Sequence, residues 1–236
     1  MKPQLETILA KSALELSKED LSSNNSYFIY ENGKTVDVGS QTKLNEIKEL
    51  FDNGLNPLAA IKEADYPPNV LLINMIYNVV YRNANPEHLI LIALEYTSKD
   101  SLSHLPKDKQ EILLDVISEH SSMANVEKLF EKGLRLKEEQ NEDRALECKM
   151  AKEGKVEFFE ILKFYQPDFN LGKKYTSDDG QYNLSEIISD EMSYETDKNK
   201  KEKLSNLKVF INTNLFHSKL DNSIENKSGM SGKAKI

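Results

Sequence analysis

The stretch AKEGKVEFFEILKFYQPDFN (residues 151–170) decides the fold. A helical segment ends near Gly154, and a second segment follows in which Phe158, Phe159, Ile161 and Leu162 form an apolar stripe. Gly154 can end a helix because it adopts the left-handed conformation without a steric penalty from a Cβ atom. The stretch therefore predicts two helices joined by a tight turn.

The same pattern recurs along the chain. Segments with apolar residues at three- and four-residue steps, each followed by a break, lie at 44–57, 85–98, 123–136 and 155–170, with a weaker copy at 203–216. The breaks are 33 to 48 residues apart, a loose period that is typical of helical repeats. We therefore predict an all-α fold, a short solenoid of about five helix pairs stacked in single file.

The first 41 residues differ from this repeat region. Leu5, Ile8, Leu9 and Leu16 have roughly helical spacing, which predicts an N-terminal helix that caps the stack. The stretch YFIYENGKTVDV (27–38) places β-prone runs on either side of Asn32-Gly33, a pair that favours a tight turn. It predicts a small β-hairpin, with an irregular loop as the alternative because a lone two-stranded hairpin is only marginally stable.

The expected organisation is an N-terminal capping region at 1–41, a repeat domain at 42–217 and a C-terminal tail at 218–236. Beyond Phe216 the sequence loses its period and becomes rich in Ser, Asn, Gly and Lys. This composition predicts a disordered tail.

These motifs resemble the ankyrin repeat, a β-turn followed by two antiparallel helices in about 33 residues. DDGQYNL (178–184) resembles the turn that opens a repeat, with Asp179-Gly180 as the turn pair, and FDNGLNP (51–57) and FEKGLRL (130–136) carry the glycine that ends an outer helix. The family's Thr-Pro-Leu-His tetrapeptide is absent, so apolar packing has to carry more of the stacking. Another solenoid of helix pairs, or an unrelated helical bundle, remains an alternative.

Composition limits the classes of partner and the compartment that we expect for this protein. The net charge of −8 repels phosphate, so we expect no nucleic-acid partner. The single cysteine, Cys148, excludes an intramolecular disulfide and suits a reducing compartment, which predicts a cytoplasmic protein. The charged N-terminus has no apolar core, so we expect neither a secretory signal nor membrane insertion.

The sequence carries no familiar catalytic or metal-binding motif. His88, His104, His120 and His217 lie far apart, so we expect no metal and no cofactor. Cys148 is interpreted as a core residue. The acidic runs KEEQNED (137–143) and SDEMSYE (189–195) are interpreted as solvated faces. We therefore predict a protein that is not an enzyme; an enzyme whose site is assembled from dispersed residues remains an alternative.

The aromatic residues fall into two groups by their place in the pattern. Tyr77, Tyr81, Phe158, Phe159 and Phe164 lie in apolar helical stripes and are expected in the core. Tyr66 and Tyr175 lie in long connections, where an exposed aromatic side chain favours recognition.

The ankyrin resemblance implies that the polar side of the inner helices faces a concave groove, the family's usual binding surface. The predicted protein-binding residues are Tyr66, Arg82, Glu147, Lys152, Lys173, Lys174 and Tyr175. The predicted function is a non-catalytic, monomeric scaffold that binds another protein through this groove and the loop tips. Richness in Lys, Asn, Ile and Glu, the absence of Trp, and the ankyrin resemblance together favour an effector that an intracellular bacterium delivers into a host cell. A self-associating structural repeat protein is a further alternative.

Overall fold

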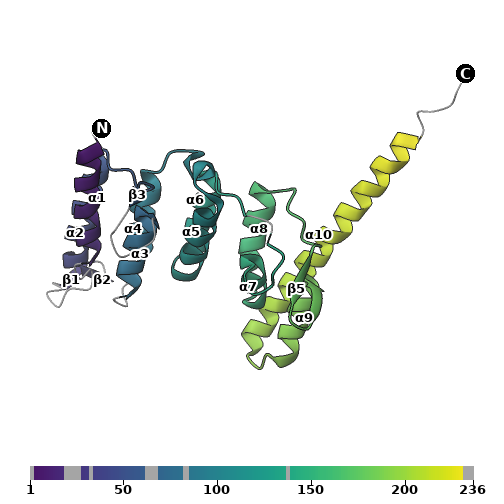
Figure 1. Cartoon of the computed structure of the whole chain (residues 1–236). Coiled ribbons are helices and arrows are strands. Elements are labelled where there is room, and N and C mark those ends of the chain that lie inside the picture. Colours follow the sequence, from purple (N-terminus) through teal and green to yellow (C-terminus); the bar gives the residue numbers. More distant parts are fainter. Residues whose placement is uncertain are drawn as a thin grey trace, which may run out of the picture. The chain divides into compact units, whose positions relative to one another are not determined.

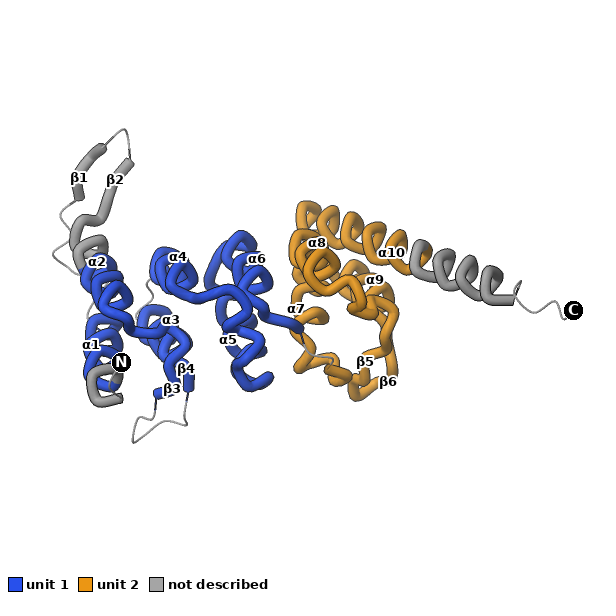
Figure 2. The backbone as a smooth tube through the Cα atoms, turned by 90° about the horizontal axis from the view of Figure 1, so that it is seen from above, with its two compact units in different colours: residues 1–136 blue, residues 137–236 orange. Residues whose placement is uncertain are grey.

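The computed structural model describes the backbone of residues 3–18, 28–31, 34–61, 69–81, 85–136 and 139–230. Side chains are described for residues 7–18, 43–61, 69–81, 85–136 and 139–216. This part of the chain is mostly helical, with short antiparallel strand pairs between helices, which confirms the predicted helical class. The chain divides into two compact units, residues 1–136 (unit 1) and residues 137–236 (unit 2) (Figure 2).

The described helices of unit 1 form pairs in chain order (Figure 1). The pairs are α1 (Pro3–Lys18) with α2 (Val38–Asp52), α3 (Leu71–Tyr81) with α4 (Glu87–Glu95), and α5 (Lys107–His120) with α6 (Met123–Glu131). A 3₁₀ turn, η1 (Ser101–His104), precedes α5. Helix α3 contacts α1 and α5, while α4 contacts α2 and α6. Each pair therefore packs on the next, and α1, expected as a cap, packs on both α2 and α3.

Two short strand pairs accompany these helices. Strands β1 (Phe28–Glu31) and β2 (Lys34–Asp37) are antiparallel, and Glu31 lies opposite Lys34. The hairpin predicted around Asn32-Gly33 is thus confirmed by its strands, although these two residues lie outside the described part of the chain. Strands β3 (Ala60–Ile61) and β4 (Asn69–Val70) pair directly before α3.

Unit 2 combines helices with one hairpin. Its elements are α7 (Leu146–Lys152), α8 (Val156–Tyr165), β5 (Lys174–Ser177), β6 (Gly180–Asn183), α9 (Leu184–Tyr194) and α10 (Lys198–Met230). Helix α7 contacts α8 and α9, and α10 contacts α7, α8 and α9. Helix α10 continues to Met230, so most of the segment expected to be a disordered tail is helical (Figure 1).

Glycines end helices at the positions that the sequence predicts. After α6, Gly133 has a φ of 96°, and a Cβ atom there would lie 2.8 Å from the Cα atom of Asp100. After α7, Gly154 has a φ of 70°, and its Cβ atom would lie 3.0 Å from the Cβ atom of Lys203 in α10. Both positions need glycine because the left-handed backbone and the close approach each disfavour a side chain.

The core contains the apolar stripes of these helices. Leu71, Leu72, Ile73, Met75 and Ile76 of α3 are fully buried. The rings of Phe158 and Phe159 in α8 are also fully buried and meet edge to face, with centroids 5.4 Å apart.

Three aromatic residues expected in the core are instead exposed: Tyr77 (46%), Tyr81 (91%) and Phe164 (77%). Tyr81 is the last residue of α3, and Phe164 lies two residues after buried Leu162, which turns its ring to the opposite side of α8. The expectation was wrong for these three residues because an apolar helical segment still has one face away from its partners.

Candidate functional site

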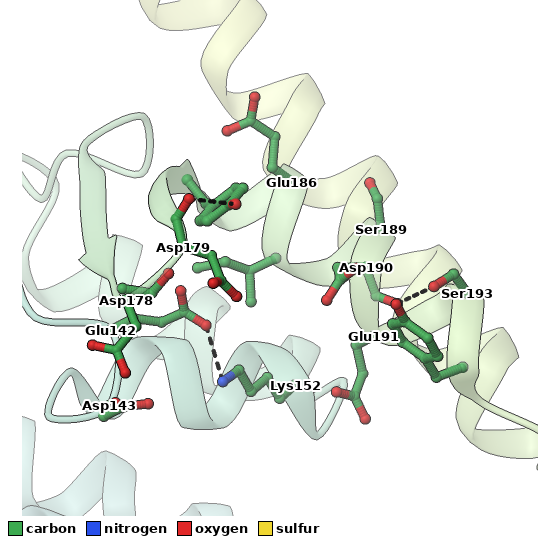
Figure 3. Close-up of a pocket in the computed structure, with 14 residues that line it drawn as sticks. Glu142, Asp143, Lys152, Asp178, Asp179, Glu186, Ser189, Asp190, Glu191 and Ser193 are labelled. Carbon is green, nitrogen blue, oxygen red and sulfur yellow. Dashed lines mark hydrogen bonds and ion pairs between the residues drawn. The ribbon is translucent and has the colours of Figure 1, made fainter.

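Unit 2 contains an open groove with a volume of about 850 Å³ (Figure 3). Its walls come from the segment before α7, the end of α7, the β5–β6 hairpin and α9. The lining residues are Glu142, Asp143, Lys152, Ser177, Asp178, Asp179, Tyr182, Glu186, Ile187, Ser189, Asp190, Glu191, Ser193 and Tyr194. The site is therefore dominated by carboxylates, with two tyrosines among them.

The hairpin turn supplies two of these carboxylates. Ser177 pairs with Gly180, so the turn residues are Asp178 and Asp179. The predicted turn pair, Asp179-Gly180, was off by one residue because Gly180 is already the first residue of β6. The Tyr182 hydroxyl donates to the Asp179 carbonyl oxygen at 3.4 Å, which keeps its ring beside the turn.

Helix α9 supplies a second wall, and a capping box fixes where it begins. The Asn183 side chain accepts from the Glu186 amide at 3.0 Å, and the Glu186 side chain accepts from the Asn183 amide at 2.8 Å. Such reciprocal bonds satisfy two amides that the first turn of a helix leaves without partners. Glu186, Asp190 and Tyr194 then follow at steps of four residues, and all three side chains are exposed on the groove side.

The segment before α7 forms the opposite wall because it pairs with β5. The Thr176 amide donates to the Gln140 carbonyl oxygen at 2.7 Å, and the Glu142 amide donates to the Thr176 carbonyl oxygen at 3.0 Å. Glu142 also forms an ion pair with Lys152 at 3.0 Å. The hydrogen bond that the Lys152 ammonium group donates to Glu142 raises the pKa of Lys152 despite the opposing effect of burial, so the lysine stays charged at neutral pH.

The electrostatic balance of the groove is strongly negative. Seven carboxylates and a single lysine line it. Glu142 is paired with Lys152, and Glu191 is paired with Lys200 of α10 at 2.8 Å. Within the described residues, Asp143, Asp178, Asp179 and Asp190 have no ion-pair partner. Unpaired carboxylates lining one concave surface attract cations and repel anions.

The groove offers little covalent chemistry. Its lining includes neither histidine nor cysteine. Cys148 is fully buried outside the groove, and burial raises the pKa of its thiol, so it is a core residue as predicted. Among the described residues no cluster of histidine, cysteine and acidic side chains could hold a metal ion.

Three of the residues predicted for partner binding come together, but in the interior. Glu147 and Tyr175 are fully buried, and the Lys173 side chain is only 12% exposed. Tyr175 was expected to be exposed; this was wrong because it occupies the inward-facing position of β5, between exposed Lys174 and exposed Thr176. Of the other predicted residues, Lys152 lines the groove, Lys174 is exposed on β5, and Tyr66 and Arg82 lie outside the described residues.

The sequence interpretation missed most of the groove. The acidic runs 137–143 and 189–195 were expected to be solvated faces. Instead, the first contributes to the wall before α7 and the second to the α9 wall of the groove. One signal could have found α9: Glu186, Asp190 and Tyr194 share one helical face directly after the predicted turn.

Comparison with protein-family models, curated proteins and solved structures returns no match for this chain. Within the described residues, every helix is too short or too polar to cross a membrane.

Proposed function

We propose that this protein is a non-catalytic scaffold with an ankyrin-like stack of helix pairs, and that its unit 2 groove binds a lysine- or arginine-rich segment of another protein. The observation that carries the proposal is the composition of the groove, seven carboxylates with one lysine around a volume of about 850 Å³. A cavity of this size accommodates several side chains of an extended peptide.

The tyrosines support a basic polypeptide as the ligand. Tyr194 of α9 is 79% exposed, Tyr182 of β6 is 36% exposed, and both line the groove. A guanidinium or ammonium group is attracted to the face of an aromatic ring and forms charge-assisted hydrogen bonds with carboxylates. Asp178, Asp179 and Asp190 would supply these bonds, since they have no ion-pair partner within the described residues.

The arrangement of elements supports the ankyrin-like part of the proposal. Successive helix pairs contact each other in chain order within each unit, glycine ends α6 and α7, and the β5–β6 hairpin leads directly into α9. A groove between a hairpin and inner helices is where such a stack presents its loops. Action inside a host cell stays a prediction.

The test uses a fluorescein-labelled deca-lysine peptide and fluorescence anisotropy. The variant Asp178→Asn/Asp179→Asn/Asp190→Asn should weaken binding by about tenfold or more, because it removes the unpaired carboxylates. The matched control is Glu157→Gln/Glu160→Gln/Asp168→Asn, which changes the net charge equally through exposed unit 2 residues that do not line the groove. It should bind as the wild type does.

Equal weakening by both variants would show that only net charge matters, and the groove would then not be the site. The self-associating alternative is tested by size-exclusion chromatography with light scattering. If the oligomer grows with protein concentration and the wild type does not bind deca-lysine, self-association replaces the proposed scaffold function.

A further inference from the structure

The proposed function requires the hairpin wall of the groove to be held in one position. Resting on that function, we propose that the buried cluster of Glu147, Lys173 and Tyr175 is a register lock for β5. In this role the three are positioning residues, because none of them lines the groove.

The lock is built around one carboxylate. Glu147 Oε1 lies 2.7 Å from Lys173 Nζ and accepts a hydrogen bond from the Tyr175 hydroxyl at 3.1 Å. The Lys173 ammonium group also lies over two rings, 4.8 Å from the Tyr175 centroid and 5.0 Å from the Phe169 centroid. The other oxygen, Oε2, is buried without a hydrogen-bond partner in the described part of the chain. Glu147 therefore depends on Lys173 and Tyr175.

Strand geometry makes this cluster specific for one register. Lys173 and Tyr175 are two residues apart and both approach Glu147, while Lys174 between them is exposed. Because side chains alternate along a strand, a slip by one residue would turn Tyr175 outward and Lys174 inward. The slip would also take the Tyr175 hydroxyl away from the buried Glu147 carboxylate, whose Oε2 already has no hydrogen-bond partner in the described part of the chain. Loss of a hydrogen bond to a buried charge is unfavourable.

The lock is adjacent along β5 to the residues that position two groove walls. Tyr175 lies opposite Tyr182, a groove residue, in the hairpin register. The next residue, Thr176, makes the backbone bonds that hold Gln140 and Glu142 beside the strand. The Asp178-Asp179 turn follows two residues later. Fixing Tyr175 therefore fixes Tyr182, the turn carboxylates and the Glu142 wall.

The test replaces the ion pair by apolar side chains of similar length, Glu147→Met/Lys173→Met, which leaves the net charge unchanged. Its matched control is Glu153→Met/Lys155→Met, which removes an exposed unit 2 ion pair with a 3.9 Å separation. The first readout is amide hydrogen exchange of Thr176 and Glu142 by NMR, and the second is deca-lysine affinity. Tyr175→Phe, which removes only a hydroxyl group, serves as a milder variant of the lock.

In Glu147→Met/Lys173→Met we expect exchange at Thr176 and Glu142 to accelerate by roughly tenfold or more relative to the control variant. Deca-lysine affinity should fall by about tenfold while the helical circular dichroism signal is retained. Tyr175→Phe should accelerate the same two amides to a smaller extent.

Unchanged exchange at Thr176 and Glu142 in both lock variants would overturn the proposal, whatever happens to binding. Faster exchange with unchanged deca-lysine affinity would also overturn the proposal, because the cluster would then not position the groove. If the wild type does not bind deca-lysine at all, the proposed function fails, and amide exchange alone then decides whether the lock exists.

Discussion

The two units each contain a carboxylate that joins neighbouring elements, but in opposite surroundings. In unit 1, Glu87 of α4 accepts hydrogen bonds at the start of α6 from the Ser121 hydroxyl (2.6 Å), the Ser122 hydroxyl (2.7 Å), the Ser122 amide (2.9 Å) and the Asn125 side chain (3.0 Å). These donors are neutral, and Glu87 remains partly exposed. In unit 2, Glu147 is fully buried and its main partner is a lysine.

The difference shows two ways in which a carboxylate links helix pairs. Glu87 keeps part of its hydration, so its bonds contribute a modest, additive stabilisation. Glu147 has lost its hydration, so its pairing with Lys173 compensates a large desolvation cost. Removing one partner therefore costs much more stability than removing both. Apolar packing was expected to carry more of the contact between helix pairs, and in both units polar links accompany it.

The largest expected effect is at the buried link. Glu147→Leu should lower the free energy of unfolding by about 3–5 kcal/mol, because it leaves the Lys173 charge buried without its partner. Urea unfolding followed by circular dichroism measures this loss. The comparison breaks if the single substitution is no more destabilising than Glu147→Met/Lys173→Met, in which no charge is left behind.

A second test concerns the backbone contact in unit 1. Gly133→Ala should cost about 1–3 kcal/mol, because the left-handed φ is strained for alanine and its Cβ atom would meet the Asp100 backbone. Gly172→Ala in unit 2 is the control, since its Cβ atom would meet side-chain atoms and no backbone: the end of Leu215 at 2.9 Å and the Asn170 Oδ1 atom at 3.4 Å. Thermal unfolding of the two variants should rank Gly133→Ala as the less stable.

The half-exposed link should give a smaller, pH-dependent effect. Burial raises the pKa of Glu87, but the hydrogen bonds from Ser121 and Ser122 outweigh it, so the pKa lies below its ordinary value. Glu87→Gln should therefore cost about 1 kcal/mol at neutral pH. Because the folded-state pKa is lowered, this stabilisation is complete above the unfolded pKa and is lost as pH falls through the folded pKa.

The measurement for Glu87 is the difference in unfolding free energy between the wild type and Glu87→Gln as a function of pH. A difference that stays constant from neutral pH into the acid range would contradict the link, since only an ionised Glu87 strengthens the bonds.

The smallest effect is expected at an exposed link between the C-terminal ends of α2 and α4 in unit 1. The Tyr96 hydroxyl donates to Asp52, and this bond raises the pKa of Tyr96 to about 12. Asp52→Asn should return the Tyr96 pKa toward about 10 and leave the thermal midpoint close to that of the wild type. Carbon-13 NMR of the tyrosine ring measures the titration. An unchanged Tyr96 pKa in Asp52→Asn would contradict the hydrogen bond between Tyr96 and Asp52.

Local features of the fold could be predicted from the sequence. Some features depend only on neighbouring residues in the chain, so the sequence alone predicts them. They are the glycine terminators at Gly133 and Gly154 and the hairpin around residues 32 and 33. The length of α10 was missed because a polar composition also suits an exposed helix. The burial of Tyr175 was missed because it depends on which side of a four-residue strand faces α7.

The groove could be predicted only in part. Glu142 and Asp190 are far apart in sequence, and both occur in acidic runs that suit a solvated surface equally well. Their convergence depends on the pairing of the Gln140–Glu142 segment with Thr176, a tertiary contact that hydrophobic periodicity does not encode.

The burial of the single cysteine has a practical consequence. Cys148 is the only thiol in the chain and is fully buried in the structure. Its rate of alkylation therefore measures how often the packing around α7 opens. The native protein also offers a silent background on which one engineered surface cysteine can carry a dye or a cross-linker at a chosen place.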